Sequence, residues 1–253
     1  MYDIKHRISR FVPEKVKQLF RLSETHSNIT IGSFGGFDIA YRKGTADKIV
    51  IVDSIDRDIF FSGIPEYHPA DDHVIIDVGA HIGTFTLLAA SKVPRGKVYA
   101  IEPCEDSFNL LRINVCLNQS ANISLHHLAI TDRKGSCKLY YDVRNWGHTV
   151  VKNLSGHGER VETFTLTNFL EINSIDKCHF MKLNCEGAEF PILLSTPNNV
   201  LQRFDSILVL YHCDLWCDNT EEDLLSHFHY SGFNAIVRNR SEKRGWIIAT
   251  KLQ

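Results

Sequence analysis

The sequence lacks the features that mark several large classes of protein. No apolar run approaches the roughly 20 residues that a membrane-spanning helix needs, so we expect no membrane span. The first 20 residues carry charges throughout and contain no uninterrupted apolar segment, so we expect no secretory signal. The 28 basic residues nearly balance the 30 acidic ones, which gives no electrostatic argument for a nucleic-acid partner.

A disulfide framework is also missing. The seven cysteines are odd in number and scattered, which is typical of reduced thiols, and we therefore predict a cytoplasmic protein. His212, Cys213 and Cys217 form a cluster that resembles a metal site, but no second pair of ligands matches it. Because cysteine is common as a small buried residue, packing is favoured over zinc and no metal is predicted.

A chain of 253 residues can bury a full core as one α/β domain. It contains no internal repeat and no low-complexity linker. From residue 71 to 253, short apolar runs alternate with amphipathic helical patterns, which is typical of a mostly parallel sheet with helices on both faces. The last two apolar runs, 233–238 and 246–250, are predicted to form an antiparallel hairpin.

Residues 1–70 are predicted to form an N-terminal extension to this domain. A helix is expected over 13–24, a hairpin over 28–44 and a further strand over 48–54. Residues 56–73 look like a loop-rich entry to the main domain, whose aromatic side chains are better explained by packing than by substrate contact. These aromatic residues are Phe60, Phe61 and Tyr67. A cap, an acceptor-binding element and a dimer element all remain open as the role of the extension.

Residues 74–103 organise the rest of the chain. An apolar run ends in Asp77, a turn of small residues follows from Gly79 to Gly83, and a helical pattern then leads to a second apolar run that ends in Glu102. This order of elements, a strand, a tight turn, a helix and a second strand that ends in an acid, is that of the βαβ half of a nucleotide-binding fold. Ligands of such folds lie at the carboxyl ends of the strands, beside the first strand.

The turn lacks the middle glycine of the dinucleotide fingerprint, because His81 stands in its place. That glycine lets the backbone approach a pyrophosphate, so an NAD-dependent dehydrogenase is disfavoured. An acid at the entrance of the turn, Asp77, suits a cofactor that carries positive charge, such as S-adenosylmethionine. Glu102, at the end of the next strand, can accept hydrogen bonds from both ribose hydroxyls.

Five segments occur in the order in which one family has them. They are VIIDVGAHIGTFTLLAA, VYAIEPCEDSFNLLRINVCLN, LAITDRKGSCKLY, NWGHTVV and MKLNCEGAEFPILL. Over about residues 67–194 the sequence thereby resembles the FkbM-type S-adenosylmethionine-dependent methyltransferases. The resemblance implies a Rossmann-like class I methyltransferase fold, with a seven-stranded, mostly parallel sheet in the order 3-2-1-4-5-7-6 and a C-terminal antiparallel hairpin. It also implies methyl transfer to oxygen, typically to a hydroxyl of a sugar or a secondary metabolite.

The same resemblance assigns the cofactor contacts. It places the methionine part of the cofactor at the glycine turn, the ribose at Glu102 and the adenine near Ala129. The implied cofactor-binding residues are Asp77, Gly79, Ala80, His81, Gly83, Thr84, Glu102, Pro103, Ala129 and Asn184.

Methyl transfer to a hydroxyl needs alignment of the acceptor and a base for its proton. The residues predicted to act there are Glu186, His212 and Asn184, all near strand ends. Two of them have a structural alternative. Glu186 can cap the following helix or hold backbone amides, and His212 can be a core histidine whose hydrogen bonds are satisfied. Lys182 is a candidate for a buried ion pair with an acid.

Trp146 and His148 lie on a long polar loop, a type of segment that often contacts substrate, and are predicted to bind the acceptor. The sequence departs from the family at two positions. Asn184 stands where the family commonly has Asp, and Tyr211 where it tends to have Glu. Both changes remove negative charge from the predicted reaction centre.

The main functional hypothesis is therefore O-methylation of a small-molecule or saccharide acceptor, and a homodimer is compatible with it. One alternative is a catalytically silent module that binds the cofactor, because two acids are missing from the reaction centre. Another is methylation of a peptide or of RNA, although RNA is disfavoured by the balanced charge.

Overall fold

The computed structural model describes residues 28–142 and 147–252. The helix predicted over 13–24 and the residue Trp146 lie outside the described residues. No helix of the described part is long and apolar enough to cross a membrane.

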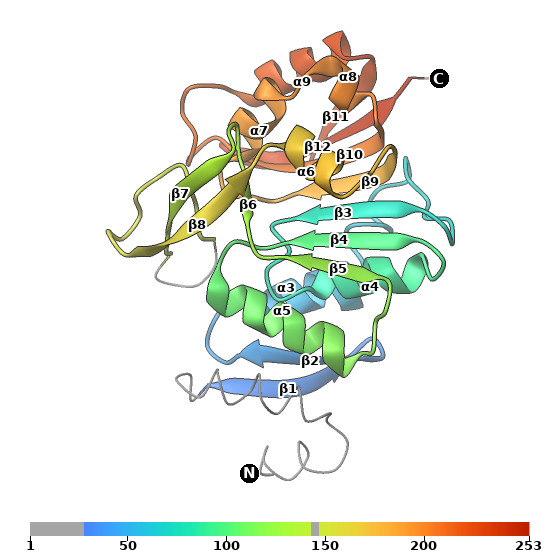
Figure 1. Ribbon diagram of the computed structural model, residues 1–253, viewed down its shortest axis with the longest axis vertical. Helices are drawn as coiled ribbons and strands as arrows, with labels where there is room; N and C mark the ends of the chain where they lie inside the picture. Colours follow the sequence, from blue (N-terminus) through green and yellow to red (C-terminus); the bar gives the residue numbers. More distant parts are fainter. Residues whose placement is uncertain (1–27, 143–146, 253) are drawn as a thin grey trace.

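The main sheet of the described chain has seven strands in the order β11-β12-β10-β9-β3-β4-β5 (Figure 1). Numbered within this sheet, the order is the predicted 3-2-1-4-5-7-6, and the α/β fold class is confirmed. Only β12 runs antiparallel to its neighbours, and it pairs with both β10 and β11. The strands are β3 (Val74–Val78), β4 (Lys97–Ile101), β5 (Ile123–His126), β9 (Cys178–Leu183), β10 (Phe204–His212), β11 (Phe233–Arg238) and β12 (Arg244–Lys251).

Helices cover both faces of this sheet, because successive residues of each buried strand point to opposite faces. Ile76 of β3 packs in the core beneath α6, α7, α8 and α9. Its neighbour Ile75 faces the opposite core, which α4 and the loop after η1 complete. The helices are α3 (Asp47–Ile51), η1 (Val52–Asp56), α4 (Thr84–Lys92), α5 (Glu105–Leu117), α6 (Leu166–Ile172), α7 (Glu189–Ser195), α8 (Asn198–Leu201) and α9 (Glu221–Tyr230).

The N-terminal hairpin is present as β1 (Ile29–Phe34) and β2 (Phe37–Arg42), but the strand predicted over 48–54 is wrong. That segment forms α3 and the π-helical turn η1 instead. Ile51 and Ile55 are buried with Ser54 between them, which is helical spacing. Tertiary packing on α4 and β2 therefore overrides the strand preference of the β-branched run.

From its apolar pattern, the segment 123–130 is predicted to form a single third strand, but in the structure it divides at residues 127 and 128. Only β5 joins the main sheet, whereas β6 (Ala129–Ile130) leaves it to pair with β8 (Gly158–Phe164). With β7 (Gly135–Tyr140), β6 and β8 form a separate three-stranded sheet at one side of the main sheet (Figure 1). The segment after Gly135, which the sequence predicts as a fourth strand at an edge, thus belongs to this smaller sheet.

The buried face of α5 is broader than its sequence predicts. Helical spacing places four apolar residues on one face, namely Phe108, Leu111, Val115 and Cys116. Leu111 is fully buried, but the other three are half-buried, and the fully covered positions include Leu110, Ile113 and Asn114. The reason is that α5 contacts the hairpin as well as the main sheet.

The aromatic residues of the loop over 56–73 pack as expected. Phe60 stacks on Trp246 with ring centroids 5.7 Å apart, and Tyr67 stacks on Phe180 at 4.5 Å. Both Phe60 and Phe61 contact Phe85 of α4. Phe60 additionally lines the cavity described below.

Candidate active site

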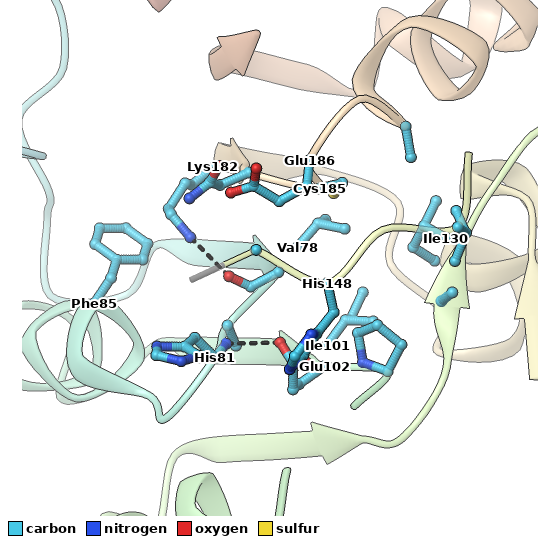
Figure 2. Close-up of a pocket in the computed structure, with 18 of the residues that line it drawn as sticks. Val78, His81, Phe85, Ile101, Glu102, Ile130, His148, Lys182, Cys185 and Glu186 are labelled. Atoms are coloured by element: carbon cyan, nitrogen blue, oxygen red, sulfur yellow. Dashed lines mark hydrogen bonds between the residues drawn. The ribbon is translucent and has the colours of Figure 1, made fainter. Parts of the chain in front are cut away.

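A cavity opens at the carboxyl ends of β3, β4 and β9, where the fold predicts a ligand. His81 in the turn after β3 and Ile130 of the smaller sheet lie on different sides of it (Figure 2). Ser54 of η1 and Phe60 also line it. Predicted site residues that line it are Gly79, Ala80, His81, Thr84, Glu102, Pro103, Ala129, His148, Asn184 and Glu186.

The turn itself requires glycine at its first position. Gly79 has φ +78°, and a Cβ there would lie 1.9 Å from the Asn184 carbonyl oxygen. Only a residue without a side chain allows β3 and β9 to approach this closely at their ends. The conformation also places His81 at φ +53°, an uncommon region for a residue with a side chain.

Glu102 is held by two backbone amides. Its Oε2 accepts a hydrogen bond from the His81 amide at 2.8 Å, and its Oε1 accepts one from the Cys104 amide at 2.9 Å. Burial raises the pKa of this carboxyl, while the nearby His81 and the two amides act in the opposite direction. Each oxygen retains a lone pair, so the carboxylate can still accept both hydroxyls of a ribose.

Asp77 does not line the cavity, which corrects the prediction of a direct cofactor contact. Its carboxylate is fully buried, accepts a hydrogen bond from Thr86 Oγ1 at 2.6 Å and pairs with Lys182 Nζ at 2.8 Å. Lys182 Nζ also donates to the Gly79 carbonyl at 3.1 Å and does line the cavity. Asp77 therefore fixes Lys182 beneath the turn, and the ion-pair alternative for Lys182 is the one found.

Gly83 is a second residue that lies outside the cavity lining, for a packing reason. It is the N-cap of α4 at φ +87°, and a Cβ there would meet the side chain of Leu111 at 2.4 Å. Its function in the fold is close contact between α4 and α5, not contact with the cavity.

Behind Glu186, which lines the opposite wall of the cavity, the His212 imidazole lies between two carboxylates. His212 Nε2 is 3.5 Å from Glu186 Oε2, and His212 Nδ1 is 3.2 Å from Glu189 Oε1. Burial would lower the pKa of His212, but the two carboxylates outweigh it and raise the pKa. Burial raises the pKa of Glu186, and His212 partly offsets that effect.

The two glutamates have separate functions in this wall. Glu189 accepts hydrogen bonds from the amides of Cys185 (2.6 Å) and Gly187 (2.8 Å), so it is the residue that holds backbone amides. Glu186 lies at φ +51°, and its carboxylate faces the cavity (Figure 2). His212 does not line the cavity and reaches it through Glu186. Arg244, which forms a bidentate pair with Asp214, lies 3.9 Å from Glu186 outside the cavity lining.

Residues 147–149 pack against Glu186. A Cβ on Gly147 would lie 2.3 Å from Glu186 Cδ, and Thr149 Oγ1 donates to the Glu186 carbonyl at 2.6 Å. His148 lines the cavity and accepts a hydrogen bond at Nδ1 from the Asp142 amide at 3.0 Å. Burial, with the charges of Arg42 and His81, lowers the pKa of His148 to about 4.

The cavity fits S-adenosylmethionine. Asn184 Oδ1 is buried in its wall with no hydrogen-bond partner among the described residues, and it can accept from the donor α-amino group of the cofactor. Glu102 would hold the ribose. The apolar end of the cavity would enclose the adenine, and its side chains are Leu128, Ala129, Ile130, Leu139 and Val150.

Comparison with known proteins supports the same conclusion. The model of the methyltransferase FkbM domain matches residues 77–234. The chain belongs to the FkbM methyltransferase family. It is an S-adenosylmethionine-dependent methyltransferase, as the resemblance implied.

The individual proteins that the chain resembles share only low sequence identity with it. Methyltransferase 1 of Beauveria bassiana (strain ARSEF 2860) is 26% identical over 180 residues, which cover 62% of this chain and 72% of that protein. The structure of the human methyltransferase 10 domain containing protein has a TM-score of 0.52 at 16% identity, covering 95% of this chain and 96% of that one. The M. jannaschii TYW2 structure in complex with AdoMet has a TM-score of 0.48 at 15% identity, covering 88% and 85%.

The sequence interpretation missed three features of this site. Glu189 is signalled only by its spacing of three residues from Glu186, at the start of α7. Asn114 accepts from the Ala40 amide and donates to the Ile82 carbonyl, which ties α5 to both the hairpin and the turn. The third is the buried pair of Arg42 and Asp47, which no local pattern distinguishes from a surface pair.

Proposed function

We propose that this FkbM methyltransferase transfers a methyl group to a hydroxyl of a sugar or secondary-metabolite acceptor, with Glu186 as the base. The observation that carries the proposal is the Glu186 carboxylate, which lines the cavity and is backed by His212 and Glu189. A hydroxyl is a weak nucleophile until it loses its proton, so a carboxylate with a raised pKa is suited to accept that proton.

Bound S-adenosylmethionine would supply an electrophilic methyl group on its sulfonium. Glu102 and Asn184 would hold it against the turn, and Glu186 would take the acceptor proton at its Oε2. Before that transfer, His212 stabilises the carboxylate charge on Glu186, since its ring nitrogen faces Oε2, while Glu189 holds the imidazole from the other side. The alignment of acceptor and methyl would come from the rigid ends of β9 and β10.

The described residues contain no group of three or more His, Cys, Asp or Glu side chains that could hold a metal ion. All seven cysteines are free thiols, in keeping with a reducing compartment, and the cytoplasmic location stays a prediction, as does the homodimer.

The test uses cofactor with a tritiated methyl group and three separate acceptor panels: hydroxylated sugars and metabolites, total RNA, and peptides. We expect label in the first panel. Label only in RNA or peptide would contradict the proposal, and no transfer to any panel would favour a silent cofactor-binding module.

The variant Glu186→Gln identifies the base. We expect turnover to fall at least about a hundredfold, the usual contribution of a positioned general base, with unchanged affinity for S-adenosylhomocysteine. Glu171→Gln, at an exposed position of α6, is the matched control. Unchanged turnover in Glu186→Gln would remove Glu186 from the mechanism.

A further inference from the structure

The N-terminal extension carries a buried ion pair. Arg42, at the end of β2, is 6% exposed, and Asp47, at the start of α3, is fully buried. Arg42 Nε and Nη2 donate to the two carboxylate oxygens of Asp47, each at 2.9 Å, and the Arg42 amide donates to Asp47 at 2.8 Å. Two hydrogen bonds thus fix the guanidinium on the carboxylate, and the third ties Asp47 to the Arg42 backbone, between the hairpin and α3.

The same guanidinium reaches the ring of His81. Arg42 Nη2 lies 2.9 Å from His81 Nε2, and it also contacts Ser107 Oγ of α5 at 3.2 Å. A guanidinium can only donate, so Arg42 binds His81 Nε2 when that nitrogen accepts. Asp47 Oδ1 lies 3.2 Å from the same nitrogen and can accept a hydrogen bond from it, because a carboxylate oxygen accepts more than one hydrogen bond. The ion pair therefore offers the imidazole a partner whether Nε2 accepts or donates.

His81 is the residue whose backbone amide orients the Glu102 carboxylate, at 2.8 Å. Its φ of +53° is unfavourable for a residue with a side chain and persists only where its surroundings hold it. Arg42 holds the side chain, while the turn holds the backbone. The ion pair and the Glu102 carboxylate thus contact the same residue, one through its side chain and the other through its backbone amide.

A second contact joins the extension to the cavity independently. Thr84 Oγ1, at the start of α4, donates to Ser54 Oγ of η1 at 3.0 Å. Val50 and Ser54 themselves line the cavity, although no sequence pattern marked them. The extension thus touches the cavity both directly and through the Arg42 side chain.

We infer that the hairpin and α3, residues 29–51, form part of the cofactor site, in which the Arg42–Asp47 pair is a positioning device for His81 and, through it, for Glu102. This inference concerns cofactor affinity and does not depend on the acceptor. It gives the extension a function within the domain, beyond the cap, acceptor or dimer functions considered from the sequence.

The test is a mutant cycle in the full-length protein, read by calorimetry with S-adenosylhomocysteine. Replacing the pair together, as Arg42→Gln with Asp47→Asn, leaves no lone buried charge. His81→Asn keeps a residue that tolerates positive φ but is too short to reach Arg42. Arg57→Gln removes an exposed arginine of the same extension and is the control.

We expect the paired replacement to weaken binding about ten- to a hundredfold, the value of one charge-assisted hydrogen bond, and to have no further effect in the His81→Asn background. Arg57→Gln should match the wild type. An affinity within about twofold of wild type for the paired replacement would overturn the inference. So would an equal loss with and without His81, because the pair would then act on the fold and not through the imidazole.

A spectroscopic measurement follows the contact directly. Nitrogen NMR should show His81 ring resonances that move on the paired replacement of Arg42 and Asp47 and keep their wild-type positions in Arg57→Gln. Unchanged His81 resonances in the paired replacement would overturn the inference, because the pair would then not hold the ring.

Discussion

Two buried glutamates at strand ends, Glu102 and Glu186, face the same cavity but are held in different ways. Glu102 is fixed by the amides of His81 and Cys104, which lie close to it at the ends of neighbouring segments. Glu186 is flanked by side chains, since His212 comes from the end of β10 and Arg244 from the start of β12. Backbone amides give a fixed acceptor geometry suited to binding, whereas the imidazole gives a partner that can share a proton. The half of the site around Glu102 is therefore held by the backbone of a local turn. The half around Glu186 depends on side chains from segments distant in the sequence.

The largest expected effect is on the Glu102 side of this comparison. Glu102→Ala removes the ribose acceptor and leaves two amides without partners, so affinity for S-adenosylhomocysteine should fall more than about a hundredfold, as two charge-assisted hydrogen bonds imply. Calorimetry measures this loss, with Glu171→Ala as the exposed control. Retained affinity would mean that the ribose lies elsewhere.

On the Glu186 side, Gly147→Ala tests the packing that holds the carboxylate. The added Cβ would come within 2.3 Å of Glu186 Cδ, so the carboxylate must move. We expect roughly tenfold slower methyl transfer, the usual cost of misplacing one reacting group slightly, with cofactor affinity preserved. An equal loss of affinity would show that the two halves of the site are not separable.

The hydrogen bonds of Asn114 connect the hairpin to the turn after β3, and they can be removed without changing Glu102 or Glu186. Asn114 is fully buried and bonds Ala40 and Ile82, whereas Asn118, one turn later in the chain, bonds Asp38 near the surface. Asn114→Ala should cost about 2–3 kcal/mol of unfolding free energy and Asn118→Ala about 1 kcal/mol or less. Denaturant unfolding measures both, and equal costs would show that Asn114 is not a special link.

The smallest effect concerns pH. The unfolded chain protonates His148 at pH values below about 6.5, whereas the folded protein resists protonation until about pH 4. The contribution of neutral His148 to the free energy of unfolding is therefore fully present above about pH 6.5. It is lost as the pH falls toward 4. Because the side chain is only partly buried, wild type should lose about 1 kcal/mol relative to His148→Gln between pH 7.5 and 5. A pH-independent difference between the two proteins would contradict the depressed pKa.

Much of the cofactor half was predictable, because its determinants are adjacent in sequence. The turn from Gly79 to Gly83 and the acid Glu102 follow two apolar runs, and these local patterns predict strands whose carboxyl ends meet. The same reasoning misassigned Asp77, since nothing local reveals that Lys182 lies 2.8 Å away in the neighbouring strand. It also misassigned residues 48–54, where packing on α4 and β2 outweighs the strand preference of a β-branched run.

The sequence alone determined the family, the alternation of strands and helices, and the positions of the glycine turn and its ribose acid, because each depends on neighbouring residues. Tertiary structure decided which acid of the pair Glu186 and Glu189 holds amides and which faces the cavity. It also decided that Arg42, far from the turn in sequence, reaches His81. The physical reason is that a side chain's partners are set by the packing of distant segments, whereas a turn's conformation is set by its own residues.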